Sequence, residues 1–86
     1  MSQLPVGIKN LKNLTHLYLY KNKLKELPPE IGDLESLIHL DVESNKLTKL
    51  PKELKNLKNL ENLDIENNLF NEFPTIIFEL KKLVKL

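Results

Sequence analysis

The 86-residue chain contains no cysteine and no arginine. Without cysteine it has no disulfide, no zinc–thiolate site and no thiol nucleophile. Without arginine it has no planar fork for bidentate contact with phosphate or guanine, which argues against sequence-specific recognition of nucleic acid. The net charge is +1, so the overall charge gives no simple electrostatic reason for a nucleic-acid or membrane partner.

Long apolar runs are also missing. No stretch approaches the roughly 20 apolar residues that a membrane span requires, and we expect a soluble chain. The opening MSQLPVGIKN has no basic region followed by an apolar one, so we expect no signal peptide, and the cytoplasm is favoured over secretion. A chain of this length forms one domain at most, and its small core predicts a modest stability.

What the sequence does contain is a repeat. Leu14, Leu37, Leu60 and Leu83 are each 23 residues apart, and the units between them follow the pattern LxxLxLxxNxLxxLPxxIxxLxx. The preceding segment LPVGIKNLKN matches the second half of this pattern. We therefore predict one domain over residues 1–86, made of a half repeat at 4–13, full repeats at 14–36, 37–59 and 60–82, and a remnant at 83–86.

The leucine spacing within one unit fits neither a long helix nor a long strand. In HLYLY, Leu17 and Leu19 alternate with polar and aromatic neighbours, which predicts a short strand with one buried face. After a turn at KNKL, apolar residues recur every third position, which predicts a short 3₁₀ or α-helical segment. Proline fits the first turn of that segment, where a missing N–H costs nothing. Stacked units would form a parallel sheet on a concave side and short helices on a convex side.

This consensus resembles the leucine-rich-repeat family over essentially the whole chain. A 23-residue unit with Leu-Pro is similar to the type found in Ras-pathway scaffold proteins and in multi-copy bacterial proteins, notably of spirochaetes. The Lys/Asn-rich LPKELKNLKNL is closest to the bacterial version. The resemblance implies an α/β fold, in the form of a leucine-rich-repeat solenoid that winds as a short right-handed β/α superhelix.

One asparagine recurs at the same position of every unit, as Asn22, Asn45 and Asn68. An exposed turn is one explanation for such an asparagine. Because all three have apolar neighbours, we expect a buried ladder instead. In it, each side chain satisfies backbone groups of its own turn and of the next coil.

Function in such a solenoid lies at exposed positions, because the consensus residues form the core. Residues at the same position of stacked strands should form columns about 4.8 Å apart across the concave face. The first unit contributes aromatic and basic side chains, whereas the next two contribute four carboxylates. The columns are His16, His39, Asn62 and Lys85; Tyr18, Asp41 and Asp64; Tyr20, Glu43 and Glu66; and Lys21, Ser44 and Asn67.

Like charges on neighbouring strands repel one another and reduce stability. Four carboxylates placed in this way predict a docking surface for a cationic segment of another protein, with the tyrosines as anchors. A solvated face that keeps the protein soluble is the alternative. The predicted partner-binding residues are His16, Tyr18, Tyr20, His39, Asp41, Glu43, Asp64 and Glu66.

A metal site on this face would use His16, His39 and Asp41, and a catalytic site would use the paired carboxylates as acid and base. An open, wet sheet has no substrate pocket and no shielding that shifts pKa values. We therefore predict no enzyme activity, no specific metal site and no cofactor. Divalent ions would bind the carboxylates weakly.

The convex side is rich in lysine, with Glu53 between the lysines. A solvated helical face explains this pattern better than a patch for polyanions or acidic lipids. The lysines concerned are Lys46, Lys49, Lys52, Lys55 and Lys58.

Neither end of the repeat array has the cap that a solenoid needs. The chain begins in mid-repeat and stops inside a fourth strand, which suggests a piece of a longer array. In the last unit, Leu69 stands where earlier units have lysine, and Phe70 and Phe73 stand where they have leucine. We expect an apolar end that joins two chains by stacking or by pairing an edge strand, and thus a structural assembly unit as the alternative function. The residues predicted for this self-association are Ile76, Phe78, Val84 and Leu86.

Overall fold

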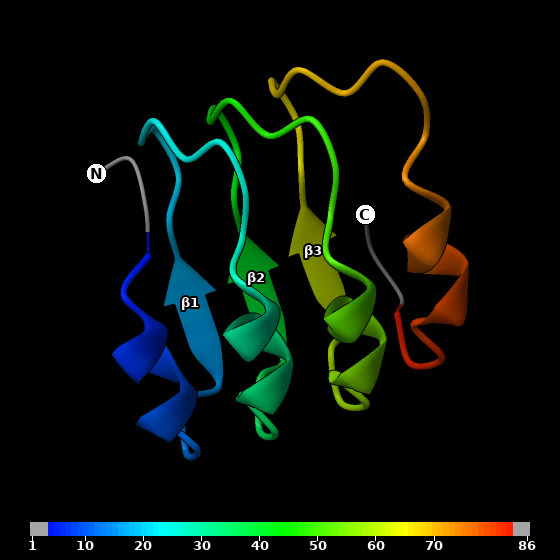
Figure 1. Cartoon of the computed structure of the whole chain (residues 1–86). Helices are drawn as coiled ribbons and strands as arrows, with labels where there is room; N and C mark the ends of the chain where they lie inside the picture. The colour runs from blue at the N-terminus through cyan, green and yellow to red at the C-terminus, as the bar shows by residue number, and fades with distance from the viewer. Residues whose placement is uncertain (1–3, 84–86) are drawn as a thin grey trace.

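A computed structural model of the chain describes residues 4–83. Short 3₁₀ helices alternate with three-residue strands (Figure 1). Within residues 4–83, no helix has the length and apolar character needed to cross a membrane. In chain order the elements are η1 (Val6–Asn10), β1 (His16–Tyr18), η2 (Pro29–Asp33), β2 (His39–Asp41), η3 (Lys52–Asn56), β3 (Asn62–Asp64) and η4 (Thr75–Glu79).

The three strands form one parallel sheet in the order β1-β2-β3. Paired residues lie one repeat apart, so Tyr18 is opposite Asp41, and Asp41 is opposite Asp64. The hydrogen bonds continue past the strand ends, since the N–H of Lys21 donates to the carbonyl of Glu43 at 2.9 Å. This register confirms the predicted columns that run from His16 to Asn62 and from Tyr18 to Asp64. Lys85, predicted as the last member of the first column, lies outside the described residues.

All four helices in the described part of the chain are of the 3₁₀ type, the tighter of the two predicted forms. Three residues per turn match the spacing of the apolar positions, which recur every third residue. Pro28 and Pro51 have extended backbone angles (φ/ψ of −70°/153° and −69°/147°) and immediately precede the first helical residue. The recurring proline thus lies one residue before the first turn, rather than within it as expected. Pro29 does occupy the first turn of η2.

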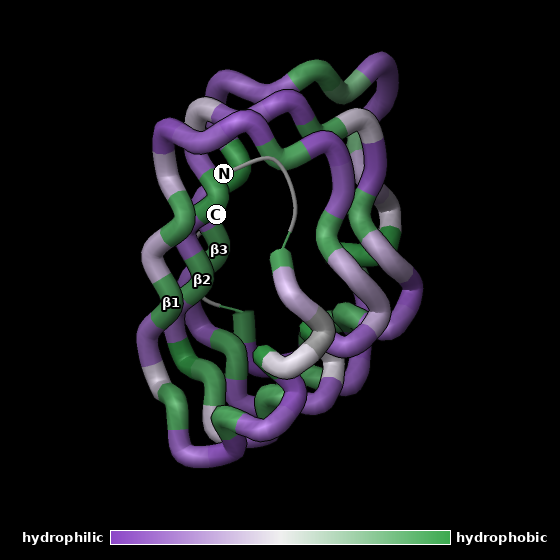
Figure 2. The backbone as a smooth tube through the Cα atoms, turned by 60° about the vertical axis from the view of Figure 1, so that its left-hand side comes forward, coloured by the Kyte–Doolittle hydropathy of each residue, from purple (hydrophilic) through white to green (hydrophobic). Residues whose placement is uncertain are grey.

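The core lies inside the coils, where apolar side chains fill the space that the backbone encloses in Figure 2. Leu37, Leu40 and Leu60 are completely buried. Leu14 and Leu17 of the first coil are only half-buried. Because β1 pairs with β2 alone among the described strands, a neighbouring strand covers it on one side only.

The recurring asparagines tie adjacent coils together. Asn45 accepts a hydrogen bond from the N–H of Leu24 at 3.1 Å and donates to the carbonyl of Leu19 at 2.9 Å. It therefore bonds to the coil before its own, not to the next one as expected. Asn68 repeats this pattern one unit later, whereas Asn22 bonds only to its own turn within the described residues. The predicted ladder is present, although only Asn45 is fully buried.

The helices η2 and η3 approach one another closely at Gly32. A Cβ atom at this position would lie 2.5 Å from the backbone oxygen of Glu53, which is too close for any side chain. One repeat later the equivalent residue is Lys55. Because Lys55 carries a Cβ, η4 cannot approach η3 in the way that η3 approaches η2.

Candidate functional site

The outward side of the sheet is the concave face predicted from the sequence. Three rings gather at its β1 end. The rings of His16 and His39 stack with their centroids 5.7 Å apart, because the two residues are paired across β1 and β2. The ring of Tyr18 lies 5.2 Å from that of His39. Tyr18 is 56% exposed and Tyr20 is also exposed, so both leave aromatic surface open to solvent.

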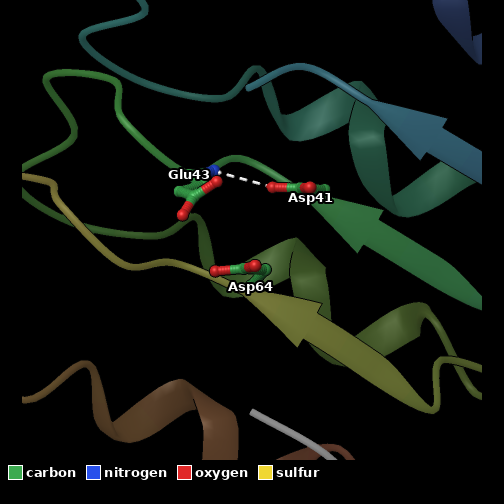
Figure 3. Close-up of side chains that lie close together, drawn as sticks. All are labelled: Asp41, Glu43 and Asp64. Carbon is green, nitrogen blue, oxygen red and sulfur yellow. Dashed lines mark hydrogen bonds between the residues drawn. The ribbon is translucent and has the colours of Figure 1, made fainter. Parts of the chain in front are cut away.

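Three carboxylates cluster on the strands β2 and β3 and just beyond β2 (Figure 3). The cluster is next to Tyr18, which is paired with Asp41 across β1 and β2. Oxygen atoms of Asp41, Glu43 and Asp64 lie within 4.8 Å of one another. Oδ1 of Asp41 accepts a hydrogen bond from the N–H of Glu43 at 3.0 Å, and Oδ1 of Asp64 accepts one from the N–H of Glu66 at 3.3 Å. These local bonds orient both aspartates where the chain leaves the strand.

The negative charge of this cluster is not balanced. The pKa of Glu43 is raised above 4.5 by partial burial and then by the charges of three neighbouring carboxylates. The positive charge of Lys21 acts in the opposite direction, but its effect is the smallest of these. A cationic group bound at the cluster would relieve the repulsion among the carboxylates.

Metal binding would use a different set of residues from the one expected. Within residues 4–83, the acidic and histidine groups that come within reach of one ion are Asp41, Glu43 and Asp64, and not His16 with His39 and Asp41. The two histidines stack ring on ring instead of converging on a common point. An all-carboxylate set suits Ca²⁺ or Mg²⁺ rather than zinc.

The concave face ends at three residues with left-handed backbone. Lys21, Ser44 and Asn67 have φ of 58°, 58° and 57°. Each directly follows one residue of the column Tyr20, Glu43 and Glu66. Asparagine adopts this conformation readily, whereas lysine and serine do so at a cost. The repeat predicted these three as the final column, and Asn67 was the one sign of their conformation.

A second hollow, the η3–η4 cleft, lies between η3 and η4 and has a volume of about 550 Å³. Sequence reasoning missed it, because it assigned Lys55 to a solvated convex face and Phe78 to an apolar end. The signal that would have found it is the change from Gly32 to Lys55 and Phe78 at one position of the repeat. The side chains that line the cleft include Lys55, Lys58, Lys81, Lys82, Phe78 and Glu79.

The residues predicted for self-association have different environments. Phe78 is 76% exposed, and its ring lies 5.6 Å from that of the exposed Phe73. Ile76 is half-buried and packs against the core. Val84 and Leu86 lie outside the described residues.

Comparisons with known proteins reveal the relatives of this fold. The leucine-rich repeat region family matches residues 1–86. A leucine-rich-repeat protein of Leptospira interrogans is 42% identical, with a TM-score of 0.96, and the match covers 99% of this chain and 22% of that one. The Arabidopsis thaliana receptor kinase GASSHO1/SCHENGEN3, whose ectodomain was solved in complex with Casparian strip integrity factor 2, is 28% identical, with a TM-score of 0.75 and coverage of 99% and 13%. The plant peptide hormone receptor RGFR1 in complex with RGF2 is 33% identical, with a TM-score of 0.71 and coverage of 95% and 18%.

No curated protein sequence matches the chain. The chain spans less than a quarter of the length of each similar structure named above. The parallel sheet, the alternating 3₁₀ helices and the match to the Leptospira protein confirm the predicted α/β solenoid. On the evidence of its repeat, its structure and its match over all 86 residues, the chain belongs to the leucine-rich-repeat family.

Proposed function

We propose that the chain is a non-catalytic binding module that holds a cationic segment of another protein against its concave face. Leucine-rich-repeat domains commonly bind proteins or peptides and are typically non-catalytic. The observation that carries the proposal is the register that aligns Tyr18, Asp41 and Asp64 on adjacent strands. It sets an exposed aromatic ring directly next to a cluster of carboxylates.

This arrangement suits a ligand with lysine or arginine side chains. A ring face attracts a cation, and the neighbouring carboxylates accept its N–H groups. Exposed ion pairs contribute only about 0–1 kcal/mol each. The exposed surfaces of Tyr18 and Tyr20 therefore supply the apolar contact that such a complex needs, with charge setting the specificity.

Charge reversal on the concave face tests the proposal. A fluorescent peptide of alternating lysine and tyrosine should bind the wild-type chain saturably, as measured by fluorescence anisotropy. The double variant Asp41→Lys/Asp64→Lys should abolish this binding. Because both aspartates also accept backbone hydrogen bonds, Asp41→Asn/Asp64→Asn keeps the acceptor oxygens and removes only the charge. It should weaken binding strongly as well.

A matched control changes the same number of charges elsewhere. Asp33 and Glu35 are exposed, at the end of η2 and just after it, and Asp33→Lys/Glu35→Lys should bind the peptide nearly as well as the wild type. Equal loss of binding in the control and concave-face variants would leave only the net charge as an explanation. That result, or no saturable binding by the wild type, would refute the proposal.

A second candidate function is self-assembly through the apolar C-terminal coil. The supporting observation is the exposure of Leu69, Phe73 and Phe78 on that coil. Sedimentation velocity at tens of micromolar should show dimers if this function is correct, and Phe78→Ser should dissociate them while Asp41→Lys/Asp64→Lys should not. A strict monomer would reject self-assembly and leave the concave-face proposal standing.

A further inference from the structure

We propose that the η3–η4 cleft is a second docking site, which binds a short acidic peptide segment carrying one aromatic or large apolar side chain. The acidic residues of the segment pair with the lysines of the cleft, and its apolar side chain lies against Phe78. This site is separate from the concave face, since it is formed by the helical side of the coils.

Charge complementarity identifies the occupant. Among the described residues, four exposed lysines line the cleft against a single glutamate, Glu79. The ammonium group of Lys82 is held near the cleft, because it donates to Oδ1 of Asn59 at 3.2 Å. Asn59 is held in turn by a hydrogen bond from its Nδ2 to the carbonyl of Glu35 at 3.2 Å. A lysine ammonium has three donors, so Lys82 uses one of them to keep its position and presents the others to a carboxylate.

The phenylalanine in the cleft adds an apolar requirement. Phe78 is 76% exposed, and its ring makes a tilted contact with that of Phe73. A ligand that covered this ring would remove apolar surface from water, which a purely acidic ligand cannot do. Aromatic side chains of a partner pair well with an exposed ring in the tilted or offset arrangement.

The shape of the cleft favours a peptide over a membrane surface. Its volume of about 550 Å³ lies within the usual range for ligand pockets, about 300–1,000 Å³. A 3₁₀ helix of five residues is about 10 Å long, so about three extended residues span the cleft along η3. A flat lipid surface would touch only the rim and leave the interior of the cleft unfilled.

The test uses the complete chain and a defined probe, the fluorescein-labelled peptide acetyl-Glu-Asp-Phe-Glu-Asp-amide. Fluorescence anisotropy should show saturable binding that weakens with added salt. Replacing the phenylalanine of the peptide by alanine, or making Phe78→Ala in the protein, should weaken binding. The double variant Lys55→Gln/Lys81→Gln should weaken it by about tenfold, because two exposed ion pairs are lost.

Two controls separate this site from nonspecific attraction. Lys23 and Lys25 are exposed and lie outside the cleft, so Lys23→Gln/Lys25→Gln should leave peptide affinity nearly unchanged. The concave-face variant Asp41→Asn/Asp64→Asn should bind the acidic peptide as well as the wild type or better. Circular dichroism should show the same fold for all variants, since the substituted side chains are not buried.

Four outcomes would overturn the proposal. The first is an absence of saturable peptide binding. The second is an equal loss of peptide affinity in Lys55→Gln/Lys81→Gln and in Lys23→Gln/Lys25→Gln. The third is that the chain binds phosphatidylserine vesicles through Lys55 and Lys81 but does not bind the peptide. That result would assign the cleft to a membrane surface. The last is a dimer that sedimentation detects without peptide and that Phe78→Ala abolishes. In that case a second copy of the chain would occupy the cleft.

Discussion

Replacing Asn45 by leucine tests whether the asparagine ladder holds the coils together. The Asn45 side chain makes four hydrogen-bond contacts. Its oxygen accepts from the N–H of Leu24, and its NH₂ group shares two hydrogens among the carbonyls of Leu19, Val42 and Glu43. Leucine removes all four contacts. The size of the effect depends on which of these backbone groups retain another partner.

Each of the three carbonyls keeps another hydrogen-bond donor when Asn45 is replaced. Asn22 still donates to the carbonyl of Leu19, Asn68 still donates to that of Val42, and a backbone N–H still donates to that of Glu43. The N–H of Leu24 has no such substitute among the described residues, and Leu24 is completely buried, so water cannot replace the asparagine. An unpaired buried N–H costs about 1–3 kcal/mol.

A chain of this size is expected to have an unfolding free energy of about 4–13 kcal/mol. Losing about 1–3 kcal/mol should lower the melting temperature by roughly 5–20 °C. Urea unfolding followed by circular dichroism measures the free energy, and thermal unfolding measures the temperature shift. Asn22→Leu is the matched control, because Asn22 occupies the same repeat position but, among residues 4–83, bonds only to carbonyls of its own turn.

Asn22→Leu should lower the unfolding free energy clearly less than Asn45→Leu does. If both variants lost the same stability, the contacts between coils would not explain the effect. If Asn45→Leu melted like the wild type, the idea that the ladder stabilises the stack would be wrong.

Three further predictions concern other positions. Ser44→Asn should raise the unfolding free energy by about 0.5–1 kcal/mol, because Ser44 has φ of 58° and asparagine adopts this conformation more readily, as Asn67 does; urea unfolding would show it. Gly32→Ala should lower the unfolding free energy by about 1–3 kcal/mol, because the new Cβ would lie 2.5 Å from a backbone oxygen. Gly7→Ala should be neutral or slightly stabilising in the same assay, because a Cβ there has no atom within 4 Å. Glu43→Gln should raise the melting temperature at pH 7, and this gain should disappear below pH 4.5. The pKa of Glu43 is raised in the fold, so its ionised form destabilises the protein as the pH rises through that pKa. A gain in melting temperature that stayed the same from pH 7 to below pH 4.5 would contradict this reasoning.

The sequence by itself determined which residues become neighbours in the sheet. In a stack of identical parallel units, residue i lies opposite residue i+23, so the contact between Tyr18 and Asp41 is readable from spacing alone. The same reasoning predicts the buried leucines, the short helices and the position of the asparagines. These features depend only on the phase of the repeat, which the linear pattern contains in full.

Only the tertiary structure decided how closely the coils approach and which way individual groups point. The carboxylate of Glu43 joins those of Asp41 and Asp64 because the chain turns after each strand, which periodicity does not describe. The η3–η4 cleft lies beside Lys55, which takes the place that Gly32 has in the preceding coil. Such distances are set by atoms in contact across neighbouring coils, and a consensus pattern treats those coils as identical.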